Sequence, residues 1–173
     1  MLSGLALVGC AGGSKVYDHT IYHTRWPDFF AAGASDEIST RVWANPFEAP
    51  VTATETVVVE ALAQARNNPG WHFTTQPQVE VFGRPYIGVL FNFPRGQKGW
   101  ACADFSGREL DPPLPGQVTV LAAICRGGAP LAAVRGHADN VTGPDDPAFR
   151  NLMVQVGYML FRRPFQSLDP ELN

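Results

Sequence analysis

The stretch Val118-Thr119-Val120-Leu121-Ala122-Ala123-Ile124-Cys125 is apolar almost throughout and has the length of a single strand. The residues Arg126-Gly127-Gly128-Ala129-Pro130 follow it, and the chain then continues as a second apolar run from Leu131 to Ala138. Apolar and β-branched residues are typical of buried strands, and a Gly-Gly pair between two such runs is typical of a tight turn. The pattern therefore predicts an antiparallel β-hairpin.

The segments on the N-terminal side of this hairpin also have strand character. The run Tyr86 to Phe93 is nearly all apolar and is bounded by proline, which is typical of a central strand covered on both faces. Shorter stretches alternate polar and apolar residues or are rich in aromatic and β-branched ones. We therefore expect further strands at 16–24, 37–43, 71–75 and 78–82.

Two segments have the apolar spacing of helices. In the first, Thr52 and Glu55 have the spacing of a capping box, and five apolar residues from Val57 to Ala65 fall on one stripe. In the second, Asp146 suits an N-cap and Pro147 the first helical position. The sequence thus predicts helices at about 52–67 and 146–163. The expected fold is α+β, with a two-layer, mostly antiparallel β-sheet and both helices packed on one face.

The composition narrows the class of protein. The chain has 173 residues, a formal net charge of −3 and 45% hydrophobic residues, which fits one globular domain. An acidic balance argues against nucleic acid as a partner, because nucleic-acid binders carry a basic stripe. We expect a signal-peptide-like segment at 1–9, a tether at 10–15, a single α+β domain at 16–166 and a tail at 167–173.

The N-terminal residues Leu7-Val8-Gly9-Cys10 resemble the lipobox of bacterial lipoproteins. The resemblance implies that residues 1–9 are removed and that Cys10 becomes a lipid-modified N-terminus, which places the protein on a membrane through its acyl chains. The residues Ala11-Gly12-Gly13-Ser14 then serve as a short tether. Since no Lys or Arg precedes Cys10, two alternatives stay open: a start upstream of Met1, or an N-terminal strand that ends in an inert cysteine.

The remaining cysteines form a natural pair. If Cys10 carries lipid, Cys102 and Cys125 are left, and an oxidising compartment would join them as a disulfide. Two buried free thiols in a cytosolic protein are the alternative. The disulfide prediction therefore depends on the anchor.

One long loop is the first place to expect a ligand or a partner. Residues 96–116 are rich in Gly and Pro and carry Trp100, Asp104 and Phe105. Loops of this length are uncommon in compact domains and are often functional. We take these three residues as the candidate ligand or partner loop.

The residues that resemble a known family are spread along most of the chain. They are Asn45-Pro46-Phe47, Phe73-Thr74-Thr75 before Pro77, Phe91-Asn92-Phe93-Pro94, Cys125-Arg126-Gly127, and Asp146-Pro147-Ala148-Phe149-Arg150. Together with the lipobox, they resemble an uncharacterised family of proteobacterial lipoprotein-like proteins. The resemblance implies an architecture and a location in the cell envelope, facing the periplasm and on the outer membrane rather than the inner. It implies no activity.

Three hypotheses on function follow. The first is a non-enzymatic envelope lipoprotein that binds or scaffolds another envelope component, with a membrane and an envelope protein as partners and without a metal or a cofactor. The second is a hydrolase or metal-dependent enzyme that uses His72, His137, Asp104 and Asp139, which requires them to converge in one pocket. The third is a soluble cytoplasmic α+β domain.

Overall fold

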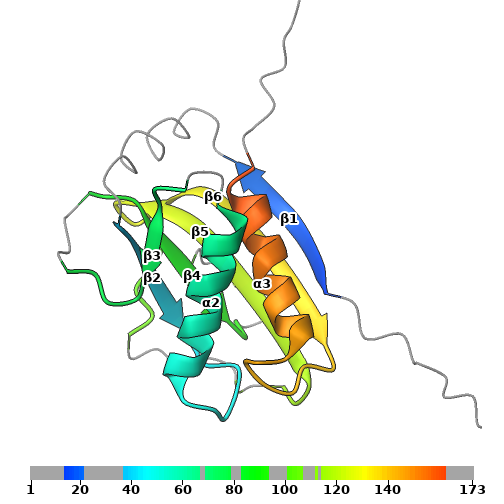
Figure 1. Cartoon of the computed structure of the whole chain (residues 1–173). Helices are drawn as coiled ribbons and strands as arrows, with labels where there is room; N and C mark the ends of the chain where they lie inside the picture. Colours follow the sequence, from blue (N-terminus) through cyan, green and yellow to red (C-terminus); the bar gives the residue numbers. More distant parts are fainter. Residues whose placement is uncertain are drawn as a thin grey trace, which may run out of the picture.

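The computed structural model describes residues 14–21, 37–66, 69–78, 83–93, 101–106, 112 and 114–162. They form a six-stranded sheet with two helices side by side on one of its faces (Figure 1), which confirms the predicted α+β class. The strands lie in the order β1-β6-β5-β4-β2-β3. Their bounds are β1 Lys15–Ile21, β2 Glu37–Trp43, β3 His72–Thr74, β4 Tyr86–Phe91, β5 Gln117–Arg126 and β6 Ala129–Asp139, and those of the helices are α2 Val51–Ala65 and α3 Pro147–Leu160.

The predicted hairpin lies inside the sheet, with a strand on either side of it. Strands β5 and β6 pair antiparallel, with Leu121 opposite Arg135, and β4 pairs antiparallel with the other edge of β5. Gly127 and Gly128 form the turn with φ of 56° and 79°, a left-handed conformation that glycine adopts without strain. Strand β4 is buried along five of its six residues, as expected for a strand covered on both faces.

The sheet is mixed, because β2 runs parallel to both of its neighbours, β4 and β3. The remaining pairs are antiparallel. Parallel neighbours need a crossover connection, and α2 supplies it between β2 and β3. The mostly antiparallel sheet is therefore confirmed, with a parallel βαβ unit that the residue pattern did not indicate.

The main core lies between the helices and the sheet, and glycines allow close packing there. A Cβ atom on Gly136 of β6 would lie 2.7 Å from Cδ1 of Leu152, so only glycine lets α3 approach the sheet this closely. A Cβ atom on Gly157 would lie 2.6 Å from the Ala65 Cβ atom, where α3 meets α2. These contacts fix both helices against the same face.

The start of α2 differs from the prediction. The helix begins at Val51 after Pro50, and Pro50 provides no side-chain cap, so the expected capping box of Thr52 and Glu55 is wrong. The hydroxyl of buried Thr54 instead donates a hydrogen bond of 2.8 Å to the side-chain oxygen of Asn45. Asn45 thus binds a side chain of the first turn of the helix from a loop, a contact that local spacing does not reveal.

The start of α3 agrees with the prediction. Asp146 is the N-cap, and its carboxylate accepts a hydrogen bond of 2.8 Å from the backbone N–H of Ala148. Pro147 occupies the first turn. The helix ends at Leu160, three residues before the predicted end.

Several predictions fall partly or wholly outside the described residues. These are the segment 1–9, the tether up to residue 13, the end of the strand 16–24, most of the strand 78–82, much of the loop 96–116 and the tail 167–173. Neither of the two described helices has the length and apolar character needed to cross a membrane.

Candidate functional site

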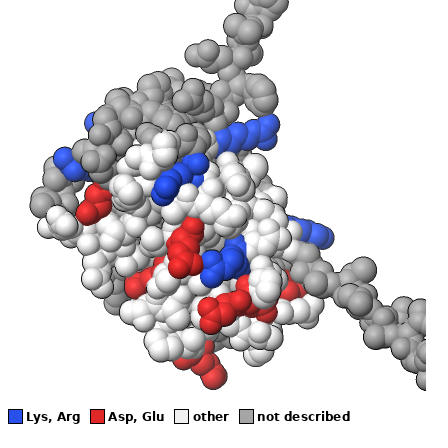
Figure 2. All heavy atoms as spheres, in the orientation of Figure 1, with Lys and Arg blue, Asp and Glu red and all other residues white. Residues whose placement is uncertain are grey.

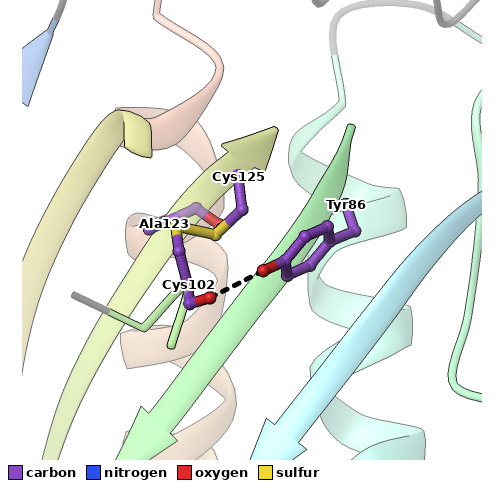
Figure 3. Close-up of a disulfide and its surroundings, with 4 residues drawn as sticks. All are labelled: Tyr86, Cys102, Ala123 and Cys125. Carbon is purple, nitrogen blue, oxygen red and sulfur yellow. Dashed lines mark hydrogen bonds between the residues drawn. A yellow bond between two sulfur atoms is a disulfide. The ribbon is translucent and has the colours of Figure 1, made fainter. Parts of the chain in front are cut away.

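The face of the sheet opposite the helices is covered by a short segment, residues 101–106. The disulfide Cys102–Cys125 joins this segment to β5, with the two Cα atoms 5.4 Å apart (Figure 3). The predicted cysteine pair is therefore present as a disulfide. We call this side of the sheet the stapled face; its buried residues are Leu90, Leu121, Ala123, Cys125 and Ala133 from the sheet and Ala101, Cys102 and Phe105 from the segment.

The segment lies directly on the backbone of β4. A Cβ atom on Gly88 would collide with the carbonyl oxygen of Ala101, so glycine is required for this contact. Figure 3 shows the Tyr86 side chain beside the disulfide, and its hydroxyl donates a hydrogen bond of 2.8 Å to the carbonyl of Cys102. Tyr86 thus ties the backbone of the segment to β4.

Electrostatic contacts continue across the stapled face. The guanidinium carbon of Arg41 lies 4.5 Å from the centre of the Tyr86 ring, and that of Arg135 lies 5.6 Å from the Phe93 ring. Both are cation–π distances. Burial raises the pKa of the Tyr86 hydroxyl above its ordinary value; Arg41 opposes this rise, and Asp104 adds to it.

The predicted ligand or partner loop has two described members. Phe105 is buried and packs against Trp43 with ring centres 6.2 Å apart, so its side chain belongs to the core of the stapled face. Asp104 is exposed, and its carboxylate accepts a hydrogen bond of 2.9 Å from the Ser106 N–H. Trp100 lies outside the described residues.

The four residues of the enzyme hypothesis do not converge. His137 and Asp139 are in contact on β6, at 2.9 Å. His72 is on β3, which four strand spacings of ~4.8 Å separate from β6, or roughly 19 Å. Asp104 belongs to the segment over the stapled face. Within the described ranges, no three His, Cys, Asp or Glu side chains gather where they could hold a metal ion.

A groove lies at one end of the sheet, where three loops meet. The loops lead into α2, into β5 and into α3, and the groove between them has a volume of about 480 Å³. Its lining is mainly apolar, with Glu48 as its one ionisable residue. The lining residues are Pro46, Phe47, Glu48, Ala49, Leu114, Pro115, Gly116, Gln117, Val141, Thr142, Gly143 and Pro144.

Hydrogen bonds fix the walls of this groove. The Asn45 side chain donates to the Ala49 carbonyl at 2.5 Å and accepts from the Phe47 N–H at 3.3 Å, which closes the first loop on itself. The N–H of Val141 donates to the carbonyl of Gly116 at 3.1 Å and joins the other two loops. The groove is therefore preformed.

Exposed apolar side chains border the groove. Leu114, in its lining, is 55% exposed, and Val51, two residues after the lining residue Ala49, is 46% exposed. The sequence alone does not indicate this site, because its walls come from three loops that lie far apart in the chain. The common feature that could have pointed to it is a proline in each loop: Pro46, Pro115 and Pro144.

The fold is an α+β domain in which a βαβ unit is joined to an antiparallel hairpin. No protein-family model matches the chain, and no curated protein matches it in sequence. Among solved structures, the chain is similar to a PelC dodecamer from Paraburkholderia phytofirmans at 15% identity, over 87% of this chain and 99% of that one, with a TM-score of 0.49. It is also similar to a variant of PelC from the same organism at 14% identity, over 88% and 99% of the two chains, with a TM-score of 0.45.

Proposed function

We propose that this chain is a non-enzymatic lipoprotein of the bacterial cell envelope, anchored through Cys10, whose folded domain binds or scaffolds another envelope component. The observation that carries the proposal is the disulfide Cys102–Cys125 in a chain whose remaining cysteine, Cys10, ends a segment that resembles a lipobox. Disulfides persist in oxidising compartments, and the periplasm is the one that a bacterial lipoprotein faces.

The position of the first described residues supports the anchor. Ser14 lies at the start of β1, an edge strand, and its hydroxyl accepts a hydrogen bond of 3.0 Å from Gln155 of α3. Lys15, the first residue of the strand, is exposed. Because the first described residues lie at the surface of the domain, a tether from Cys10 could join them without passing through the core.

The groove supports a binding role. It is preformed, mainly apolar and open, and Glu48 is the sole ionisable residue among those that line it. Acid–base catalysis generally needs at least one further titratable group with which such a carboxylate could act. A recognition surface needs a fixed shape and apolar contact, which these loops provide.

The surface charge on the helix side is mixed. Figure 2 shows acidic and basic side chains interspersed there on a largely uncharged background. One such pair joins the two helices, with Nη1 of Arg150 2.9 Å from Oε2 of Glu60. Recognition of a partner on that side would depend on shape and on individual ion pairs rather than on an electrostatic potential of one sign.

The test is the intact mass of the protein expressed in bacteria with its native upstream sequence, compared with Cys10→Ser. We expect a chain that starts at Cys10 and carries the mass of a diacylglyceryl group or of three acyl chains, and an unprocessed chain in the variant. Thiol alkylation before lysis should leave Cys102 and Cys125 unlabelled in both. An unmodified wild-type chain that retains residues 1–9 and has reactive thiols at both positions would refute the proposal.

A further inference from the structure

We propose that the groove binds an extended peptide segment of another protein, with an aliphatic side chain in the apolar lining and a neighbouring Lys or Arg beside Glu48. The inference rests on the binding role proposed above, and it names the class of partner. It does not depend on the lipid modification of Cys10.

The first argument is the backbone conformation of the loops that form the groove. Each of the three contains a residue with positive φ: Ala44 at 58°, Gly116 at 70° and Asn140 at 59°. Glycine adopts this region without a penalty, but alanine adopts it rarely, and it persists there only where the surrounding structure fixes it. Residues held in this way cluster at binding and catalytic sites. The conformation of Ala44 therefore points to a binding role for this end of the sheet.

The second argument is the apolar lining. The half-buried ring of Phe47 packs edge-on against Phe149 of α3, with the ring centres 5.0 Å apart, which fixes one wall. Leu114, on another loop, is 55% exposed, and Val51 extends the exposed apolar surface beyond the groove. The volume of about 480 Å³ lies within the range of ligand sites. An extended peptide suits this shape, because side chains on one side of it lie about 7 Å apart and can contact the groove and its border together.

The third argument is the carboxylate in the groove wall. Glu48 is exposed and is the sole ionisable residue of the lining. Other carboxylates of the domain have structural roles: that of Asp146 caps α3, and that of Glu60 pairs with Arg150. Glu48, by contrast, makes no hydrogen bond or ion pair within the part of the chain that the structure describes. It is therefore available to a cation from another molecule.

The charges at the two ends of the domain favour a basic segment. The described lining residues include no Lys or Arg, and Asp145 and Asp146 follow directly after them. The exposed cation Lys15 is on β1, which β6 separates from the groove residue before β5. At the opposite end of the sheet and helices lie four arginines: Arg66, Arg84, Arg126 and Arg162. Electrostatic complementarity therefore selects a partner segment that carries a Lys or Arg.

The experiment selects the ligand without assuming its sequence. The full chain with Cys10→Ser, purified with the disulfide intact, carries neither a lipid nor a free thiol. A random peptide library displayed on phage is enriched on this protein, and the selected peptides are synthesised for Kd measurements by fluorescence anisotropy. Two groove variants, Glu48→Lys and Leu114→Ser, have matched controls. Glu60→Lys changes another exposed glutamate, and Tyr158→Ser changes a side chain that is also 55% exposed.

We expect the selected peptides to share a Lys or Arg within two positions of an aliphatic residue. Glu48→Lys should raise their Kd about tenfold, because it replaces an attraction by a repulsion. Leu114→Ser should also raise it about tenfold, through lost apolar contact. Glu60→Lys and Tyr158→Ser should leave it within about twofold. Higher ionic strength should weaken binding to the parent protein but not to Glu48→Lys.

Three results would overturn the proposal. They are no enrichment of peptides, selected peptides that lack a basic residue, and the same Kd for the parent protein and both groove variants. Sedimentation of the parent protein and of Leu114→Ser tests a different occupant. If the parent self-associates, the variant does not and no peptide is selected, the groove belongs to a second copy of the chain and the peptide is refuted.

This proposal and the proposed envelope lipoprotein fail separately. A lipidated Cys10 in the cell without groove-dependent peptide binding would leave the lipoprotein standing and refute this class of partner. Groove-dependent binding together with an unmodified Cys10 would support the peptide site and refute the anchor.

Discussion

The two faces of the sheet are covered by different means. On one face, two amphipathic helices, α2 and α3, bury a large continuous core against the strands. On the stapled face, the described cover is the segment 101–106, and the buried cluster has eight members. One sheet is therefore closed by regular structure on one side and by a covalently held irregular segment on the other.

The difference follows from how each cover satisfies its own backbone. A helix pairs most of its N–H and C=O groups internally and offers an apolar stripe, so packing alone holds it in place. An irregular segment lacks such internal pairs and loses more conformational entropy per buried side chain. Here the segment is held by the disulfide to Cys125, the hydrogen bond from Tyr86 and the close contact at Gly88.

The largest expected effect compares one phenylalanine from each face. Phe149→Ala on α3 should lower the free energy of unfolding by about 3–5 kcal/mol, because Phe149 is fully buried between rigid elements. Phe105→Ala should lower it by about 2 kcal/mol, since a short segment can collapse into the gap. Urea unfolding of both variants with the disulfide intact measures the two values. Equal losses would mean that the segment is as rigid as the helix.

The next effect comes from removing the disulfide. The bond closes a loop of 23 residues, and the combined replacement Cys102→Ala with Cys125→Ala should cost about 3 kcal/mol in the chain-entropy model. Amide hydrogen exchange should rise in residues 101–106 before it rises in α3. Cys10→Ala serves as the control and should leave both unchanged. If protection were lost in the segment and in α3 at the same time, the two faces of the sheet would not be stabilised independently of each other.

The parts that sequence predicted best are those that depend on near neighbours. The hairpin, the buried strand Tyr86–Phe91, both helices and the N-cap Asp146 all follow from periodicity and from residues a few positions apart. The disulfide Cys102–Cys125 was also predicted. That prediction rested on the expected oxidising compartment and not on the geometry of the two cysteines.

The parts that sequence missed depend on residues brought together by the fold. The partner of Thr54 is Asn45, nine positions away in a loop, so a local capping box looked sufficient. The parallel pairing of β2 with β3 involves a strand of three residues, too short to show a period. The groove joins loops near 47, 115 and 142, and no single loop indicates it.

The smallest expected effect compares two aspartates, one on each side of the molecule. The Asp146 carboxylate accepts hydrogen bonds from the N–H and the hydroxyl of Thr142 and from the Ala148 N–H, whereas Asp104 caps the exposed turn at Ser106. Asp146→Ala should cost about 1 kcal/mol through loss of the N-cap, which corresponds to a fall in Tm of about 2–4 °C. Asp104→Ala should cost a few tenths of that, because an exposed turn hydrogen bond competes with water.

The pH dependence of these variants sharpens the comparison. Burial alone would raise the pKa of Asp146, but the hydrogen bonds from Thr142 and Ala148 outweigh it and hold the pKa below its ordinary value. A carboxyl whose pKa is lower in the folded protein adds stability above its unfolded pKa of about 4, and this stability is lost as the pH falls through the folded value. The difference in Tm between wild type and Asp146→Ala should therefore be full at pH 7 and shrink below about pH 4. Asp146→Asn keeps a good N-cap and should lose little stability at pH 7, so a full-sized loss in this variant would assign the effect to charge rather than to capping.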